Sequence, residues 1–320
     1  MHLSYWLRLI CLVLFSVGII QVTLHLLMQL ATHLAKRGID RMTARFQERI
    51  YFAGPIASHV VALLLSLLVV APQYIRGETN PLQERVGLVC VIGAGLVAIR
   101  YLYGLLRAIQ LLLQMHAHEL GHEPAVQVGE VTVHICADGY PLLAVAGLFS
   151  PRIVLSQHLL NNASFSPQLL EIALAHEKAH LRQHDNLKHF ILASFALSGL
   201  GMEGSLKRWR HAAEHAADDD AVSGSSSRAI LLAETLLVAA RAIPLQRTTA
   251  FSLGLLPHEE ELDQRIGRLL RDVPVLTAPV TPIRRHMMYA AAFFLASACT
   301  MVHLCAASLY EVAEYLLHLG

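Results

Sequence analysis

Three apolar runs, separated by polar segments, occupy the first third of the chain. They cover about Trp6 to Met28, Ala53 to Ala71 and Val86 to Leu106. A helix needs roughly 20 apolar residues to cross the hydrocarbon core of a bilayer, and each run meets that length, the second with the smallest margin. A signal peptide is the alternative for the first run, but its apolar core is too long and no small-residue cleavage site follows. The pattern predicts three transmembrane helices in residues 1–107.

A more polar stretch, residues 108–285, follows the third apolar run and is expected to form a folded domain. Between Val126 and Ser156, short runs rich in Val and Ile alternate with turn residues, which predicts two or three strands. A fourth apolar run, about Met287 to Leu309, predicts a fourth transmembrane helix within residues 286–320, followed by a short tail. The predicted fold is therefore a mainly α membrane protein, with an α+β domain inserted between the third and fourth transmembrane helices.

Composition agrees with a membrane protein. The 320 residues are 55% hydrophobic and 15% charged, which is too apolar for an ordinary soluble domain. The net charge of +1 gives no indication of nucleic-acid binding. The five cysteines form no Cys-x-x-Cys pair, so they are expected to be small buried apolar residues rather than disulfides or zinc ligands.

Basic residues predict the orientation in the membrane. The first connecting segment, residues 33–50, is expected to be a basic cytoplasmic loop, whereas residues 73–85 contain only two basic residues. The domain then lies in the cytoplasm and both termini lie outside. Arg284 and Arg285 precede the fourth run, as expected for a cytoplasmic flank. The basic residues of the first loop are Lys36, Arg37, Arg41, Arg45 and Arg49.

The strongest chemical motif lies in residues 171–186, EIALAHEKAHLRQHDN. Ser166 and Pro167 are typical of a helix start, so the motif is predicted to be helical. Residues four apart share one face of a helix, so His176 and His180 can bind one metal ion, with Glu177 beside them as a candidate base.

A second copy of the pattern begins at His118 and ends at His122. Gly121 and Pro124 weaken the helix there, so this copy is expected to be a polar extension of the third transmembrane helix rather than the metal site.

A catalytic zinc site needs a third protein ligand, and residues 209–222, WRHAAEHAADDDAV, supply one. Glu214 is the expected ligand. Asp218, one helical turn later, is the expected acceptor for a histidine N–H. Two small residues, Ala217 and Ala221, lie on the same face and permit close helix packing. His184 lies ~12 Å along the helix from His176, which is too far to share the ion.

Other polar residues near these motifs have alternative interpretations. His211 and His215 form a rival pair on another face of the helix, without an adjacent glutamate. Asp219 and Asp220 are expected to be solvated. The apolar run from Phe190 to Met202 is too short to span a bilayer comfortably, and one crossing would separate Glu214 from His176. This run should therefore be buried, interfacial or re-entrant.

The chain resembles the BlaR/MecR-type membrane metallopeptidases, gluzincins that are related to the HtpX-like proteases. The resemblance rests on LAHEKAHLRQHDN, on Glu214-x-x-Ala217-Asp218-x-x-Ala221, on GLFSPRIVLS at residues 147–156, and on LDQRIGRLL at residues 262–270. It implies a zincin-like domain in which one Zn²⁺ is bound by His176, His180 and Glu214, with Glu177 as the catalytic base. It also implies a multi-pass protein of a bacterial-type inner membrane.

Members of that family that sense β-lactams carry an extracellular penicillin-binding domain after the last span, and the sequence ends at Gly320 without one. Antibiotic sensing is therefore not expected. The expected function is zinc-dependent cleavage of a cytoplasmic or membrane-associated protein, such as a transcriptional repressor, in regulated proteolysis. One alternative is a signal-transducing protein whose proteolysis is secondary or self-directed, and another is an inert metal-binding membrane protein.

Two further roles stay open at the level of sequence. The substrate backbone is expected to add to a strand edge beside the motif helix, and either residues 153–155 or residues 142–145 could provide that edge. An oxyanion donor is also expected, with His258, His215 and Tyr140 as unranked candidates.

Overall fold

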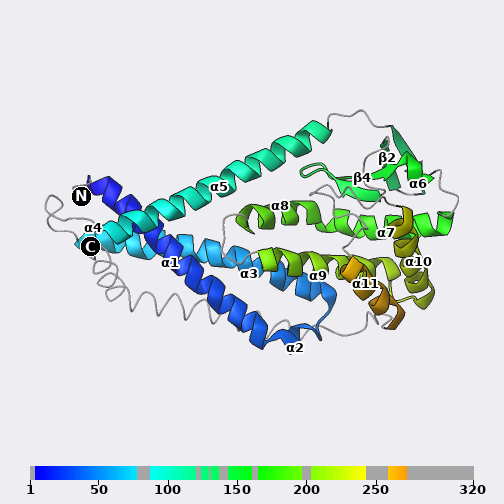
Figure 1. The fold of residues 1–320 in the computed structure, drawn as a ribbon, viewed down its shortest axis with the longest axis horizontal. Helices are drawn as coiled ribbons and strands as arrows, with labels where there is room; N and C mark the ends of the chain where they lie inside the picture. The colour runs from blue at the N-terminus through cyan, green and yellow to red at the C-terminus, as the bar shows by residue number, and fades with distance from the viewer. Residues whose placement is uncertain are drawn as a thin grey trace.

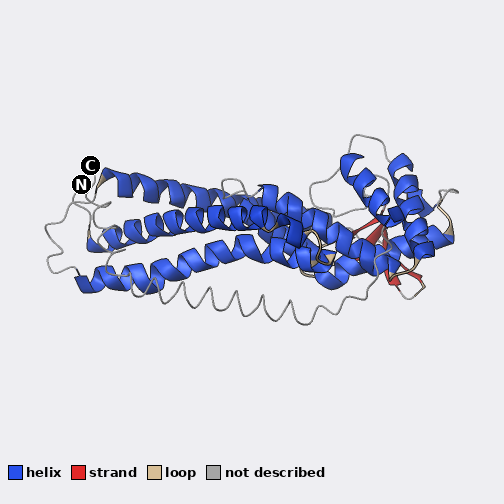
Figure 2. Ribbon diagram, turned by 90° about the horizontal axis from the view of Figure 1, so that it is seen from below, coloured by secondary structure: helices blue, strands red, loops and turns tan. Residues whose placement is uncertain are grey.

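The protein is mainly helical, with one small sheet. The computed structural model describes residues 4–77, 87–119, 124–129, 131–136, 143–160, 165–196, 203–242 and 259–271. The molecule is elongated, and long helices at one end lead into a compact region that contains the sheet at the other end (Figures 1 and 2). The expected fourth transmembrane helix lies outside the described residues.

Three described helical segments are long and apolar enough to cross a membrane, as predicted: Tyr5–Leu34, Ala44–Arg76 and Leu88–Leu113. The first is α1 (Tyr5–Leu34) and the third belongs to α5 (Leu88–Glu119). The second is a continuous helix made of α3 (Ala44–Leu65), the π-helical turn η1 (Ser66–Val70) and α4 (Ala71–Gly77).

These helices pack together yet leave apolar side chains exposed on their outer faces. Gly18 and Gly93 permit the close approach of α1 and α5, because a Cβ atom at Gly18 would lie 2.4 Å from the Val97 side chain. Leu68, Leu96 and many other large apolar residues of these helices are exposed. Apolar surface on this scale favours contact with lipid, so the three helices indicate membrane association.

The basic segment at residues 33–50, expected to be a loop, is largely helical. It contains the end of α1, the short helix α2 (Lys36–Ile39) and the first two turns of α3, which begins at Ala44. The helix starts early because Arg45 and Glu48 form ion pairs with the domain instead of being solvated in a loop.

The domain contains a four-stranded mixed sheet, one strand more than the upper estimate from sequence. The strands are β1 (Ala125–Val128), β2 (Val131–Cys136), β3 (Leu143–Ala146) and β4 (Arg152–Ser156). Their order is β1-β2-β4-β3, with β4 parallel to β2 and antiparallel to β3. Strand β4 is therefore internal, and β3 forms an edge of the described sheet.

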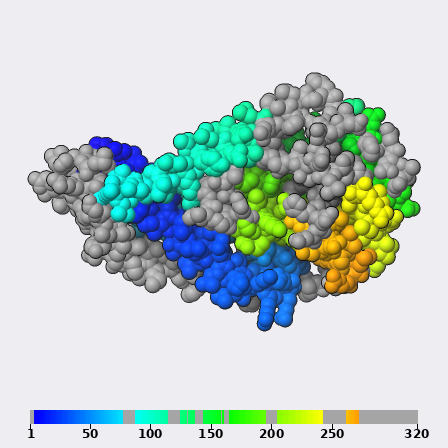
Figure 3. Space-filling view, in the orientation of Figure 1, coloured from blue at the N-terminus to red at the C-terminus, as the bar shows by residue number. Residues whose placement is uncertain are grey.

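In the described part of the chain, six helices follow the sheet in sequence. They are α6 (Gln157–Leu160), α7 (Pro167–Gln183), α8 (Asp185–Ala196), α9 (Glu203–Val222), α10 (Ser226–Ala242) and α11 (Glu259–Arg271). The main core lies between the sheet and helices α7, α9 and α10, with Val133, Ile153, Ile172 and Leu232 among its fully buried members. Helices α10 and α11 lie side by side at the far end of the molecule (Figure 3).

The described part of the apolar run that begins at Phe190 belongs to α8, which packs against α9 rather than leading away from it. Leu192 of α8 is buried with Trp209 and Ala213 of α9, and three apolar residues of α3 complete this cluster. Residues 197–202 lie outside the described residues. Helix α3 also runs alongside α9, so a helix that belongs to one of the candidate membrane spans is packed directly on the domain (Figure 1).

Candidate metal centre

Helix α7 carries the His-Glu motif and has well-defined ends. Ser166 is the N-cap residue, and its side chain accepts a hydrogen bond from the Leu169 N–H, while Pro167 occupies the first turn, as predicted. The helix ends at His184, which adopts a left-handed conformation with φ 55°. The chain turns there and α8 begins at once with Asp185.

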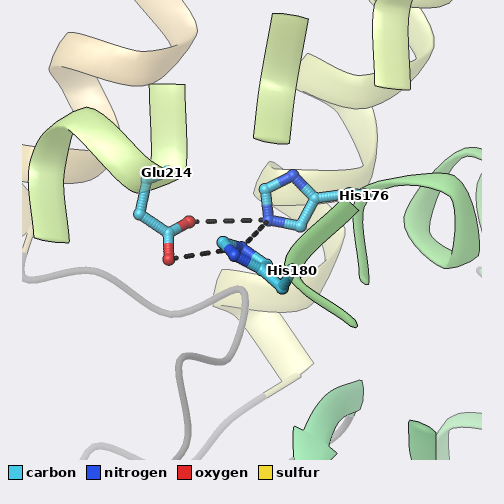
Figure 4. A group of neighbouring side chains, drawn as sticks. All are labelled: His176, His180 and Glu214. Carbon is cyan, nitrogen blue, oxygen red and sulfur yellow. Dashed lines mark hydrogen bonds and ion pairs between the residues drawn. The ribbon is translucent and has the colours of Figure 1, made fainter. Parts of the chain in front are cut away.

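Three side chains from two helices converge at the expected position. Residues His176 and His180 lie on one face of α7, and Glu214 faces them from α9 (Figure 4). The two histidine Nε2 atoms are 3.1 Å apart. One carboxylate oxygen of Glu214 is 3.5 Å from Nε2 of His176, and the other is 3.6 Å from Nε2 of His180. Among the described residues, this is the group of three potential ligands that could hold a metal ion.

The spacing of these atoms suits a small tetrahedral ion. Metal–ligand bonds of about 2.0–2.2 Å place tetrahedral ligands roughly 3.3–3.6 Å apart. The observed separations of 3.1, 3.5 and 3.6 Å fall close to that range. Three protein ligands leave a fourth position open, which is the arrangement that catalytic metal sites use.

The other nitrogen of each imidazole faces a carboxylate. Nδ1 of His176 lies 3.1 Å from Asp218, and Nδ1 of His180 lies 2.8 Å from Asp185. A carboxylate in that position favours the tautomer that carries its proton on Nδ1. Both Nε2 atoms then present lone pairs toward each other and toward Glu214, so a bound cation satisfies all three groups.

The charges of the site are compatible with a bound cation. Three buried carboxylates, those of Asp185, Glu214 and Asp218, lie around the two histidines, and Arg265 pairs with the last two of them. Buried charge is costly unless it is compensated, so a positive ion between these groups would be stabilised.

Arg265 of α11 bridges the two acidic residues of α9. Its guanidinium group donates two hydrogen bonds to Asp218, at 2.9 and 2.6 Å, and lies 2.8 Å from Glu214. Burial alone would raise the pKa of Glu214, but Arg265 and the two histidines lower it to about 2. The pKa of Asp218 is held far below its usual range for the same reason. Both carboxyl groups are therefore ionised near neutral pH.

Glu177 is buried beside the ligands, and within the described part of the chain neither of its carboxylate oxygens makes a hydrogen bond of ordinary geometry. Burial raises the pKa of this carboxyl to about 8, although the nearby His180 opposes the shift. A buried carboxylate with unengaged oxygens next to a metal centre is suited to proton transfer, because its pKa lies near the operating pH.

Small residues bring the two ligand helices together, as the sequence predicted. Ala217 and Ala221 share the face of α9 that carries Glu214 and Asp218, both are buried, and α9 packs against α7. Strand β3 lies against α7 on another side. Asn186 fastens this strand by donating hydrogen bonds to the carbonyls of Val145 and Gly147.

The rival histidines do not form comparable sites. His184 is exposed at the end of α7. The rings of His211 and His215 are 4.3 Å apart, but His211 interacts with Gln264, and no carboxylate joins the pair in a metal-binding group within the described part of the chain. The second motif copy cannot be compared, because His122 and the side chain of His118 lie outside the described residues.

One expectation about the acidic residues of α9 is wrong. Asp219 and Asp220 were expected to be solvated, but Asp219 pairs with Arg268 of α11, and Asp220 pairs with Arg45 of α3. The Asp219 side chain is 16% exposed and that of Asp220 is 31% exposed, because α11 and α3 both contact α9. Tyr140 and His258, two of the oxyanion candidates, lie outside the described residues.

Reasoning from sequence missed the positions of Asp185 and Arg265 in the site. Asp185 follows His180 by five residues, which on a continuous helix would direct it away from the imidazole. The left-handed residue His184 turns it back, and a helix pattern gives no signal of that turn. Arg265 lies in a motif used for the family resemblance, but its 47-residue separation from Asp218 concealed the contact.

Comparisons with protein-family models, with curated proteins and with solved structures found no match to this chain. The chemistry of the site is therefore inferred from its own geometry.

Proposed function

We propose that this chain is a membrane-anchored, zinc-dependent endopeptidase that cleaves a cytoplasmic or membrane-associated protein. The observation that carries the proposal is the convergence of His176, His180 and Glu214 at tetrahedral spacing, with Glu177 buried beside them. Two imidazoles, one carboxylate and one open position are the ligand set of several zinc hydrolases.

The donor atoms favour zinc over the other common divalent ions. Magnesium and calcium prefer sites made entirely of oxygen ligands, whereas the two imidazole nitrogens here suit zinc and its transition-metal neighbours. Both histidines have carboxylate partners on Nδ1, an arrangement that raises ligand basicity and fixes the ring orientation.

Each residue of the site has a role in the proposed hydrolysis. When bound, zinc supplies an activated water near neutral pH and polarises the scissile carbonyl. Glu177 accepts the proton of the attacking water and delivers it to the leaving amine. Asp218 and Asp185 hold the imidazoles in place, and Arg265 keeps Glu214 and Asp218 ionised.

The sheet suggests where a peptide substrate would bind. Strand β4 is paired on both sides, so residues 153–155 offer no free edge, whereas β3 is an edge strand next to α7. An extended peptide that adds to β3 would pass the metal centre. Because Asn186 already occupies two carbonyls of this edge, the peptide must pair beside them or displace the Asn186 side chain.

The arrangement supports the proposed family and orientation. A membrane-anchored domain with a two-helix His-Glu and Glu-Asp site is what the resemblance to BlaR/MecR-type peptidases implies. The basic residues at the start of α3 lie at the same end of the molecule as the metal centre, where Arg45 contacts Asp220. By the positive-inside rule, this position supports a cytoplasmic location for the metal centre.

Metal analysis of the purified full-length chain tests the proposal. We expect about one zinc ion per chain in the wild type and in Glu177→Gln, because Glu177 is not a ligand. The substitutions His180→Ala and Glu214→Ala should each abolish stable zinc binding. A wild-type chain without zinc, or full zinc retention by His180→Ala, would contradict the proposed centre.

A further inference from the structure

The first turns of α3 carry a carboxylate that is almost fully buried. Glu48 is 1% exposed, and it lies near the start of a helical segment that is long and apolar enough to cross a membrane. Two cations hold it: Arg45 lies 2.8 Å away on the same helix, and Lys188 of α8 lies 2.6 Å away. A buried carboxylate is retained at a cost unless it is well paired.

Lys188 continues this chain of contacts into the metal centre. Its ammonium group also donates a hydrogen bond of 3.0 Å to Oδ1 of Asp185. The other oxygen of Asp185 lies 2.8 Å from Nδ1 of the ligand His180. A continuous series of charged contacts therefore runs from Glu48 through Lys188 and Asp185 to a proposed metal ligand. We call these four residues the α3 relay.

A second contact from α3 reaches the helix that carries Glu214. Arg45 lies 2.8 Å from Asp220 of α9, and Phe52 packs near Trp209, with ring centroids 6.5 Å apart. The same end of α3 thus contacts both segments that carry ligands: the junction of α7 and α8, through Lys188, and α9, through Asp220 and Trp209. A displacement of α3 cannot leave both segments unchanged, because packed interfaces shift between discrete arrangements rather than deform freely.

The orientation of a histidine ligand depends on its Nδ1 partner, and loss of that partner typically weakens metal binding by about 10–100-fold. Asp185 divides its two oxygens between His180 and Lys188, so the position of Lys188 influences how Asp185 meets the imidazole. Glu48 determines where Lys188 lies, since it provides the shorter of the two lysine contacts.

We infer that Glu48 is a positioning residue through which α3 sets the orientation of His180, so that movement of this membrane helix changes metal affinity. The inference rests on the metal centre described under the proposed function. It gives a physical route by which an event in the membrane adjusts the proposed peptidase, without a ligand that reaches the catalytic residues.

Zinc affinity of the full-length chain in lipid nanodiscs, measured by competition with a chromophoric chelator, tests the relay. We expect Glu48→Gln to weaken zinc binding by about three- to tenfold, less than the loss caused by removing a direct partner. Asp185→Asn should weaken it by about 10–100-fold. In the Asp185→Asn background, Glu48→Gln should cause no further loss, because the relay is already interrupted. The visible spectrum of the cobalt-substituted chain should change in Glu48→Gln, which reports altered ligand geometry.

A matched control is available on α7 itself. Glu171 is 75% exposed and pairs with Arg228, so Glu171→Gln removes an ion pair without touching the relay and should leave zinc affinity unchanged. If Glu48→Gln does not fold, Lys188→Met interrupts the same contacts and should show the same dependence on Asp185. Equal affinities in the wild type and Glu48→Gln, or losses from Glu48→Gln and Asp185→Asn that simply add, would overturn the relay. A wild-type chain that binds no zinc would instead overturn the metal centre itself.

Discussion

At the scale of single residues, the proposed function depends on two carboxylates that touch no substrate. Asp218 and Asp185 face the Nδ1 atoms of the two ligand histidines, from α9 and from the start of α8. By accepting a hydrogen bond from Nδ1, each carboxylate keeps the Nε2 lone pair of its histidine directed at the ion position. Of these two positions, only that of Asp218 could be predicted from the helical pattern of the sequence. Asp185 depends on the left-handed turn at His184.

We predict that Asp218→Asn and Asp185→Asn each weaken zinc binding by about 10–100-fold, because an amide is a weaker acceptor for the imidazole N–H. Competition with a chelator measures this effect. The control is Asp263→Asn on α11, where the side chain is exposed, and its zinc affinity should equal that of the wild type. Unchanged affinity in both site variants would mean that the histidines do not need these partners.

A half-buried histidine on α8, which is not one of the proposed metal ligands, predicts a pH dependence of stability. Burial, together with the charge of Arg210, lowers the pKa of His189 to about 4, while the unfolded chain should protonate near 6.5. Below pH 6.5 the unfolded state therefore binds more protons than the folded state, and stability falls as the pH drops from about 6.5 to 4. In His189→Phe, which keeps a ring against Trp209, the apparent thermal midpoint should fall less steeply over this window. An identical slope in both proteins would exclude this role.

At the scale of elements, close packing of α7 and α9 places the three proposed ligands within reach of one ion. Ala217 is 1% exposed and lies on the face of α9 that carries Glu214 and Asp218, so we expect a larger side chain there to push the packed helices apart. We predict that Ala217→Leu destabilises the domain by about 1–3 kcal/mol and weakens zinc binding at least tenfold. Thermal unfolding and chelator competition measure the two effects. The control is Ala98→Leu, at an exposed position on α5, which should change neither stability nor zinc affinity. Normal zinc binding by Ala217→Leu would show that α9 can move without loss of the site.

The elements differ in how far the sequence could predict them. Helix α7 was predictable because its cap, its first-turn proline and its histidine spacing are all local signals. The early start of α3 was not, since Arg45 and Glu48 resemble loop residues until their partners on α9 and α8 are known. The order of the strands in the sheet could not be predicted either. Pairing between β2 and β4 joins residues about 20 positions apart, and no local pattern specifies it.

At the scale of the whole molecule, the three apolar helices are joined to the polar domain, and the contact between α3 and α9 is part of this junction. We predict that the domain lies on the cytoplasmic side. A cysteine introduced at Ser226, which is exposed at the start of α10, should react with a membrane-impermeant maleimide only after the cells are permeabilised. The parent chain without this cysteine provides the background. Labelling of Ser226→Cys in intact cells would reverse the proposed orientation.

The central claim is that this chain cleaves proteins with Glu177 as the base. Its most direct test is a comparison of all new protein N-termini in native host cells that express the wild type, Glu177→Gln or Glu171→Gln at equal levels. We predict a set of N-termini that appears with the wild type and with Glu171→Gln, and disappears with Glu177→Gln, although that variant still binds zinc. The same set of N-termini in all three strains would contradict the claim.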